Sequence, residues 1–197
     1  MSIDLTYPEG ATPLDPDEIL GLKPGLQNRE ELNAFEQANI ASALIWARTS
    51  RKLKTDLLTL QSLKLLHFHM FNDTWKWAGK FRTSGKNLGC EPHEIQEQLA
   101  ILCADTKYLL ENDTYSLEEC SIRFHHRLVS VHPFPNGNGR HSRLAADLLL
   151  FFNGKQFLSW GGSSIDIEGE VRTRYLQSLK EADRKKYKSL IDFAIGK

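Results

Sequence analysis

The chain has 197 residues, of which 41% are hydrophobic, so it can form one domain with a substantial core. Its 25 basic residues balance 25 acidic ones, and this zero net charge gives no support for nucleic acid or a membrane surface as a partner. The N-terminus lacks the apolar run of a signal peptide, and no apolar run is long enough to span a bilayer. The three cysteines show no CxxC spacing, so we expect reduced thiols in a cytoplasmic protein rather than disulfides or a zinc site.

The first part of the chain differs in composition from the rest. Residues 1–27 hold four prolines and three glycines, a density that excludes a long helix. We therefore expect an extended arm over residues 1–27, followed by one domain over residues 28–197.

The rest of the chain shows the apolar spacing of helices. Asn28 with Glu31, and Ser116 with Glu119, have the spacing of capping boxes at helix starts. The inward face of the first helix is expected at Leu32, Phe35, Asn39, Ala43 and Trp46. Seven helices are predicted, over about residues 28–54, from a cap at Thr55 through Met70, and over about 92–112, 116–131, 140–153, 166–182 and 187–194. The predicted class is therefore all-α.

One segment interrupts this helical pattern. Residues 75–89 contain three glycines and several residues that favour strands, which predicts either a small β-hairpin or a loop. The two histidines just before it, His67 and His69, lack further ligands at metal-binding spacing, so a structural role is favoured for both.

The most informative stretch is His132 to Arg143, which reads HPFPNGNGRHSR. Residues Gly137, Asn138 and Gly139 directly precede a predicted helix, whose first amides lack partners within the helix and carry the positive end of its dipole. Glycine also lets a ligand approach the backbone closely. Arg140 and Arg143 lie one turn apart beyond the glycines, so the stretch predicts a phosphate-binding site.

His132 lies just before this turn. An imidazole with an unperturbed pKa near 6.5 suits a general base at neutral pH, although its place at a helix C-terminus favours the charged form. Asp147, one turn after Arg143, is a candidate for orienting that arginine. The competing interpretation is an ordinary helix-to-helix turn followed by solvated arginines, and the twelve residues together favour the phosphate site.

This combination resembles the Fic (filamentation induced by cAMP) domain family, whose signature is HPFx[D/E]GNGRxxR. Trp77 to Arg82 is similar to the WAGxxR segment of that family. The resemblance covers roughly residues 30–195, and within the family the chain looks most similar to the group called mobile mystery protein B. It implies the Fic fold, with the β-hairpin serving as a flap beside the active-site loop.

The resemblance also implies an activity, the transfer of AMP from ATP to a Ser, Thr or Tyr hydroxyl of a target protein. His132 would be the base, Gly137, Asn138 and Gly139 the anion hole, and Arg140 and Arg143 the phosphate ligands. Mg²⁺ or Mn²⁺ would accompany the nucleotide. The flap would clamp the target by strand addition; its residues are Arg82, Thr83, Ser84, Gly85, Lys86, Asn87 and Leu88. Self-modification is open, and neither the target nor the oligomeric state follows from the sequence.

The chain departs from the signature at Asn136, where the family has an acidic residue that binds Mg²⁺. An amide oxygen brings no negative charge, so weaker metal binding is expected. Two alternatives therefore stay open: transfer of another phosphate-containing group, and a nucleotide-binding module with impaired catalysis. A metallohydrolase built on His125, His126, His132 and His141 is a weak alternative, because the ligand spacing fits no recognised pattern.

Many Fic proteins are inhibited by a helix carrying [S/T]xxxE[G/N], whose glutamate pairs with the second arginine of the motif. Residues 164–169 fit these letters but fall where a core helix is expected to begin. Glu36, within the candidate inhibitory helix 28–54, fits the letters poorly but has the matching position upstream of the core. Glu36 is therefore a candidate to pair with Arg143, the alternative being a solvated helix glutamate.

Overall fold

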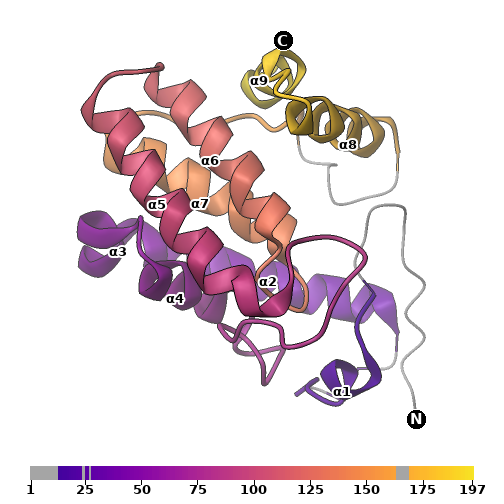
Figure 1. The fold of residues 1–197 in the computed structure, drawn as a ribbon. Helices are drawn as coiled ribbons and strands as arrows, with labels where there is room; N and C mark the ends of the chain where they lie inside the picture. Colours follow the sequence, from indigo (N-terminus) through magenta and orange to yellow (C-terminus); the bar gives the residue numbers. More distant parts are fainter. Residues whose placement is uncertain (1–12, 24, 27, 163–168) are drawn as a thin grey trace.

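The computed structural model describes residues 13–197, apart from residues 24, 27 and 163–168. The predicted all-α class is confirmed, and the described residues form no sheet (Figure 1). The helices are α1 (Pro16–Ile19), α2 (Arg29–Thr49), α3 (Arg51–Asp56), α4 (Leu60–Phe71), α5 (Ile95–Glu111), α6 (Leu117–Val131), α7 (Asn138–Phe152), α8 (Glu170–Asp183) and α9 (Lys188–Ile195), with a short 3-10 helix, η1 (Pro92–Glu94), before α5. No described helix combines the length and apolar character needed to cross a membrane.

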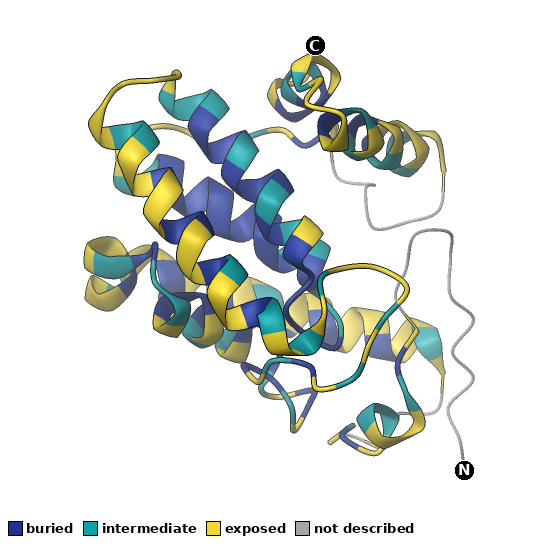
Figure 2. Cartoon of the chain, in the orientation of Figure 1, coloured by how far each residue is buried: buried dark blue, intermediate teal, exposed yellow. Residues whose placement is uncertain are grey.

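Helix α7 forms the centre of the bundle, with α2, α4 and α6 packed around it (Figures 1 and 2). It is buried along most of its length, including the polar residues Asn138, His141, Arg143 and Asp147. Ala145 and Ala146 are fully buried and let neighbouring helices approach closely. The Ser121 hydroxyl on α6 donates a hydrogen bond to the Ala146 carbonyl at 2.6 Å, which ties α6 to α7.

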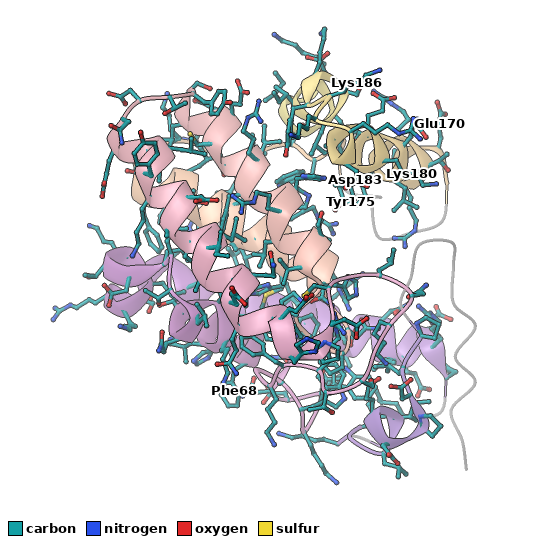
Figure 3. The ribbon with its side chains drawn as sticks, viewed as in Figure 1. Phe68, Glu170, Tyr175, Lys180, Asp183 and Lys186 are labelled. Carbon is teal, nitrogen blue, oxygen red and sulfur yellow. The ribbon has the colours of Figure 1, made fainter. Side chains whose placement is uncertain are left out.

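The C-terminal helices α8 and α9 form a second layer that packs on α6. Tyr175 and Asp183 lie on the side of α8 that faces the bundle (Figure 3). The Tyr175 hydroxyl lies 3.2 Å from His125 Nε2, and an Asp183 carboxylate oxygen lies 2.9 Å from His126 Nε2. These two histidines of α6 therefore connect the bundle to its C-terminal layer.

The predicted helix over residues 28–54 is divided in two. Ser50 has extended backbone dihedral angles, and its hydroxyl accepts a hydrogen bond from the Leu53 amide, so a new helix begins there. The next helix is capped by Thr59 and not by Thr55, since the Thr59 hydroxyl accepts from the Ser62 amide at 3.2 Å. Serine and threonine side chains compete for backbone amides in this way and end or restart helices. The capped starts predicted at Asn28 and Ser116 are confirmed.

The buried face of α2 also differs from the expected one. Phe35 is 38% exposed, whereas Glu36 is buried with only 5% of its surface accessible. The stripe follows Leu32, Glu36, Asn39, Ala43 and Ala47, a spacing of three and four residues that fits one helix face. A charged residue is tolerated on this face because it is paired, as described below.

Of the two alternatives for residues 75–89, the β-hairpin is wrong and the loop is confirmed, because this described segment contains no strand. Arg82 gives the physical reason: its guanidinium donates to the carbonyl groups of His132, Ser84 and Cys90. Backbone acceptors that a hairpin would pair with amides are thus satisfied by one side chain. The segment forms an ordered loop against the end of α6.

The described part of the N-terminal arm is only partly extended. Helix α1 interrupts it, and beyond this helix Leu22 forms an antiparallel bridge with Trp75. The Lys76 amide donates to the Gly21 carbonyl at 2.8 Å. The arm is therefore attached to the start of the same loop.

Candidate active site

The turn between α6 and α7 has an unusual backbone. His132 ends α6 in the left-handed region with φ 54° and ψ 57°, and Gly137 precedes α7 with φ 77°. A Cβ added at Gly137 would lie 2.4 Å from the Phe71 ring, so this position needs glycine for space as well as for conformation. The left-handed residue ends α6 one position before Pro133, which could not continue it.

Two side chains brace the turn from inside. Asn138 accepts a hydrogen bond from the Phe134 amide at 2.9 Å and donates one to the Phe134 carbonyl at 2.7 Å. Phe134 is fully buried, and its ring stacks on His67 with centroids 3.7 Å apart. The side chain of Asn138 thus stabilises the turn, while its backbone lies in the first turn of α7.

Asn136 lies at the outer edge of the turn. Its side-chain oxygen accepts a hydrogen bond from the Gly137 amide at 2.6 Å. The oxygen expected to face a metal is therefore used within the turn. It also occupies an amide that the sequence assigned to anion binding.

His132 is buried with 7% of its surface accessible. Burial, together with the positive charges of Arg82 and Lys86, lowers its pKa to about 4. Arg82 also holds the backbone here, because its Nε donates to the His132 carbonyl at 2.7 Å and its amide donates to the Pro133 carbonyl at 3.0 Å. His132 is therefore neutral at pH 7, although it ends a helix whose dipole favours the charged form.

Glu36 of α2 meets Arg140 of α7. One Glu36 carboxylate oxygen accepts from the Arg140 guanidinium at 2.7 Å, and the other accepts from the Trp75 indole N–H at 2.6 Å. Arg140 also lies over the Phe71 ring at 5.0 Å. The first arginine of the motif is thus engaged by a carboxylate in this structure.

The expected partner of Glu36 was Arg143, and this expectation is wrong. Arg143 follows Arg140 by three residues, which rotates it around the helix axis toward α8, and its guanidinium lies 5.6 Å from the Tyr175 ring. Asp147, expected to orient Arg143, accepts hydrogen bonds from the Leu158 amide at 3.0 Å and the Trp160 indole at 3.1 Å. Burial raises the pKa of Asp147 to about 6. These bonds fix the connector after α7.

The N-terminal arm covers part of the proposed flap. The Lys86 ammonium lies 2.9 Å from an Asp15 carboxylate oxygen and 2.6 Å from a Glu18 oxygen, and only 3% of its side chain is exposed. The Ser84 hydroxyl donates to Asp15 at 2.6 Å. Arg82 is buried and Ser84 and Lys86 are partly buried, whereas four flap residues are exposed: Thr83, Gly85, Asn87 and Leu88.

Three of these relationships were missed from the sequence. They are the Trp75 bond to Glu36, the Arg82 bonds to the turn and the contact of the arm with Lys86. Each joins residues far apart in the chain. Only the third had a local indication in the sequence, because Asp15 and Glu18 have the spacing of a capping box at a helix start. The alternative inhibitory segment, residues 164–169, lies almost wholly outside the described residues.

The all-α bundle of the described residues has the fold of solved Fic domains. An AMPPNP-bound BepC protein from Bartonella tribocorum aligns with a TM-score of 0.69 at 18% identity, covering 95% of this chain and 93% of that one. An ADP-bound Fic domain from Bartonella quintana also gives 0.69 at 18% identity, covering 89% and 88%.

The sequence comparison agrees with the fold. Residues 57–150 match the model of the Fic/DOC family, and the chain carries a domain of that family. "Probable protein adenylyltransferase y4lH" of Sinorhizobium fredii is 26% identical over 177 residues, covering 78% of this chain and 90% of that protein. "Protein adenylyltransferase fic-1" of Caenorhabditis briggsae is 36% identical over 112 residues, which cover 54% of this chain and only 20% of the nematode protein.

Proposed function

We propose that this protein is an adenylyltransferase that moves AMP from ATP to a Ser, Thr or Tyr hydroxyl of a target protein. The observation that carries the proposal is the neutral, buried His132 placed across one tight turn from the amides of α7. The family membership and the names of its relatives support the same class of reaction.

In the proposed reaction, His132 takes the proton of the target hydroxyl. The hydroxyl oxygen then forms a bond to the α-phosphorus of ATP, the bond from that phosphorus to the bridging oxygen of the β-phosphate breaks, and pyrophosphate leaves. The neutral form of His132 is the form that can accept a proton. The amides of Asn138 and Gly139 and the guanidinium groups of Arg140 and Arg143 would bind the phosphates, and the Gly137 amide would join them only by giving up its bond to the Asn136 side chain.

A divalent cation fits these residues poorly. Asn136 stands where the family has an acidic metal ligand, and its side-chain oxygen already accepts a hydrogen bond from the Gly137 amide. Mg²⁺ can be held mainly by substrate phosphates and water, so the ion would depend on the nucleotide more than on the protein. We assign no step of the reaction to it.

The Glu36–Arg140 pair supports an inhibited state. While Arg140 donates to Glu36, that N–H and much of its positive charge are directed to a carboxylate and not to a phosphate, and Trp75 holds the carboxylate in place. Residues 29–49 would thus form the inhibitory helix, with Glu36 as the inhibitory residue. This differs from the family pattern in which the second arginine is the partner.

Incubation with ATP labelled at the α-phosphate, with Mg²⁺ or Mn²⁺, tests the proposal. Label should appear on the protein itself or on a protein from the host lysate, and His132→Ala should abolish it. Transfer from the wild type and from His132→Ala alike would exclude His132 as the base. If Glu36→Gly binds ATP but transfers nothing, the adenylyltransferase proposal fails.

Asn136 favours a second candidate, the transfer of another phosphate-containing group. Labelled CTP, GTP, UTP and a nucleotide-linked phosphoalcohol, offered in parallel, separate this candidate from the first. A donor other than ATP that labels the wild type and leaves His132→Ala unlabelled would support it.

A further inference from the structure

His67 of α4 lies beneath the turn and touches both of the segments that flank the site. Its side chain is fully buried, and it stacks on Phe134 with an interplanar angle of 17°. One ring nitrogen, Nε2, lies 3.1 Å from the Asn136 carbonyl oxygen. The other, Nδ1, lies 3.0 Å from the Gly79 amide nitrogen. Gly79 belongs to the loop of residues 75–89 that contains the proposed flap, called the flap loop below.

These contacts determine the tautomer of His67. The Gly79 amide can only donate, so Nδ1 must accept and cannot carry a proton. The proton therefore lies on Nε2, where it is donated to the Asn136 carbonyl. Burial, with the neighbouring His141, holds the pKa of His67 well below its usual value, so the ring keeps this single proton at neutral pH.

We propose that His67 is a positioning residue of the site, which holds the Asn136 carbonyl and the Gly79 amide at once and so keeps the glycine turn and the flap loop in one arrangement. It touches no reacting atom and acts through the backbone. The inference rests on the proposed function for its effect on transfer, but the geometry it describes does not.

Gly79 shows why the flap loop needs such an anchor. Its φ is 72°, and an added Cβ would lie 2.8 Å from the Phe68 Cβ and 2.9 Å from the Lys64 carbonyl. The loop therefore passes close against α4 at this residue. A small change in the His67 ring would move the loop and the turn together, because both are bonded to the same five-membered ring.

Two substitutions separate the two hydrogen bonds. The amide nitrogen of glutamine reaches the position of Nε2, so His67→Gln keeps a donor for Asn136. The amide oxygen of asparagine reaches the position of Nδ1, so His67→Asn keeps an acceptor for Gly79 and loses the donor. Met70→Ala, in the same helix and fully buried, is the control for a loss of packing alone.

The first readout is nuclear magnetic resonance of the full chain. We expect the nitrogen shifts of His67 to show the Nε2–H tautomer, and the amide signals of Gly137, Asn138 and Gly139 to move in His67→Asn but not in Met70→Ala. A Nδ1–H tautomer, or unmoved turn amides in His67→Asn, would overturn the inference. This readout is independent of activity, so it stands if the proposed function fails.

The second readout is AMP transfer, normalised to the folded fraction of each variant. We expect about tenfold slower transfer for His67→Asn and a loss within about threefold for His67→Gln. The two variants differ because His67→Asn alone loses the hydrogen bond to the Asn136 carbonyl. Equal losses in the two variants, or a loss matched by Met70→Ala at the same melting temperature, would show a structural role only. The absence of transfer in the wild type would count against the proposed function and leave the spectroscopic test in force.

Discussion

Glu36 and Arg140 lie 104 positions apart in the chain and form an ion pair with a distance of 2.7 Å. The Glu36 side chain is 7% exposed and the Arg140 side chain 20% exposed, so water screens the pair only partly. The second Glu36 oxygen is bonded to Trp75, which leaves the carboxylate little freedom to move away. Arg140 therefore has a fixed competitor for any phosphate.

Replacing Glu36 by glycine should release Arg140 and raise AMP self-labelling. We expect an increase of about tenfold, or ~1.4 kcal/mol, which is close to the lower limit for hydrogen bonds to charged groups. Gln37→Gly is the matched control, since Gln37 is exposed on the same helix and the change carries the same loss of helix propensity. Equal labelling of Glu36→Gly and the wild type would remove the inhibitory role of Glu36.

The pH dependence of transfer should reflect the buried state of His132. Its pKa of about 4 lies below the ordinary 6.5, so the neutral base persists at pH 6 and is lost only near pH 4. Stability follows the same direction: the contribution of His132 is complete above pH 6.5 and decreases as the pH falls toward 4. Rates and the His132 ring resonance should titrate together, and an acid limb centred near 6.5 would contradict the assignment.

Changing Asn136 to aspartate should strengthen metal binding. One carboxylate oxygen can keep the bond from Gly137 while the other faces a cation. We expect Mg²⁺ to bind the AMPPNP complex about tenfold more tightly, equivalent to ~1.4 kcal/mol, as measured by calorimetry. Asn33→Asp, an exposed change with the same charge, should leave Mg²⁺ affinity unaltered. An unchanged affinity in Asn136→Asp would place the metal away from this residue.

Lysine cannot replace Arg82 without loss. The guanidinium of Arg82 reaches the carbonyls of His132, Ser84 and Cys90, and a lysine ammonium lacks this planar fork. Leaving one or two of these carbonyls without partners should lower the free energy of unfolding by about 2–4 kcal/mol, measured by urea denaturation. The exposed change Arg51→Lys should stay within about 0.5 kcal/mol of the wild type. A similarly small effect of Arg82→Lys would mean that the loop is held by other contacts.

The acidic residues of the arm should control access to the flap. In the double variant Asp15→Asn with Glu18→Gln, Lys86 loses both carboxylates that pair with it, so the arm should detach. We expect faster hydrogen exchange at the Lys76 amide, which is bonded to the arm at Gly21, and across residues 82–90. Asp17→Asn, exposed on the same short helix, is the control. Unchanged exchange at Lys76 would show that the backbone bridge alone holds the arm.

Local features of this chain could be predicted because their causes are local. The caps at Asn28 and Ser116 involve bonds over three residues, and the turn from His132 to Arg140 is built by consecutive residues with restricted backbone angles. The wrong predictions failed for the opposite reason. The predictions of a cap at Thr55, a buried Phe35 and a hairpin were wrong because other residues of the chain compete for the same hydrogen bonds or the same buried positions. A short window of sequence does not contain those residues.

The sequence by itself determined the all-α class, the glycine turn with its histidine and arginines, and the family to which the domain belongs. Only the tertiary structure decided the charge of His132, because its pKa depends on burial and on Arg82, which lies 50 positions away. Only the tertiary structure paired Glu36 with Arg140 and not Arg143, and assigned one proton of His67 to the Asn136 carbonyl. Backbone conformation follows from neighbouring residues, whereas electrostatics and hydrogen bonding in the site follow from what the fold packs around them.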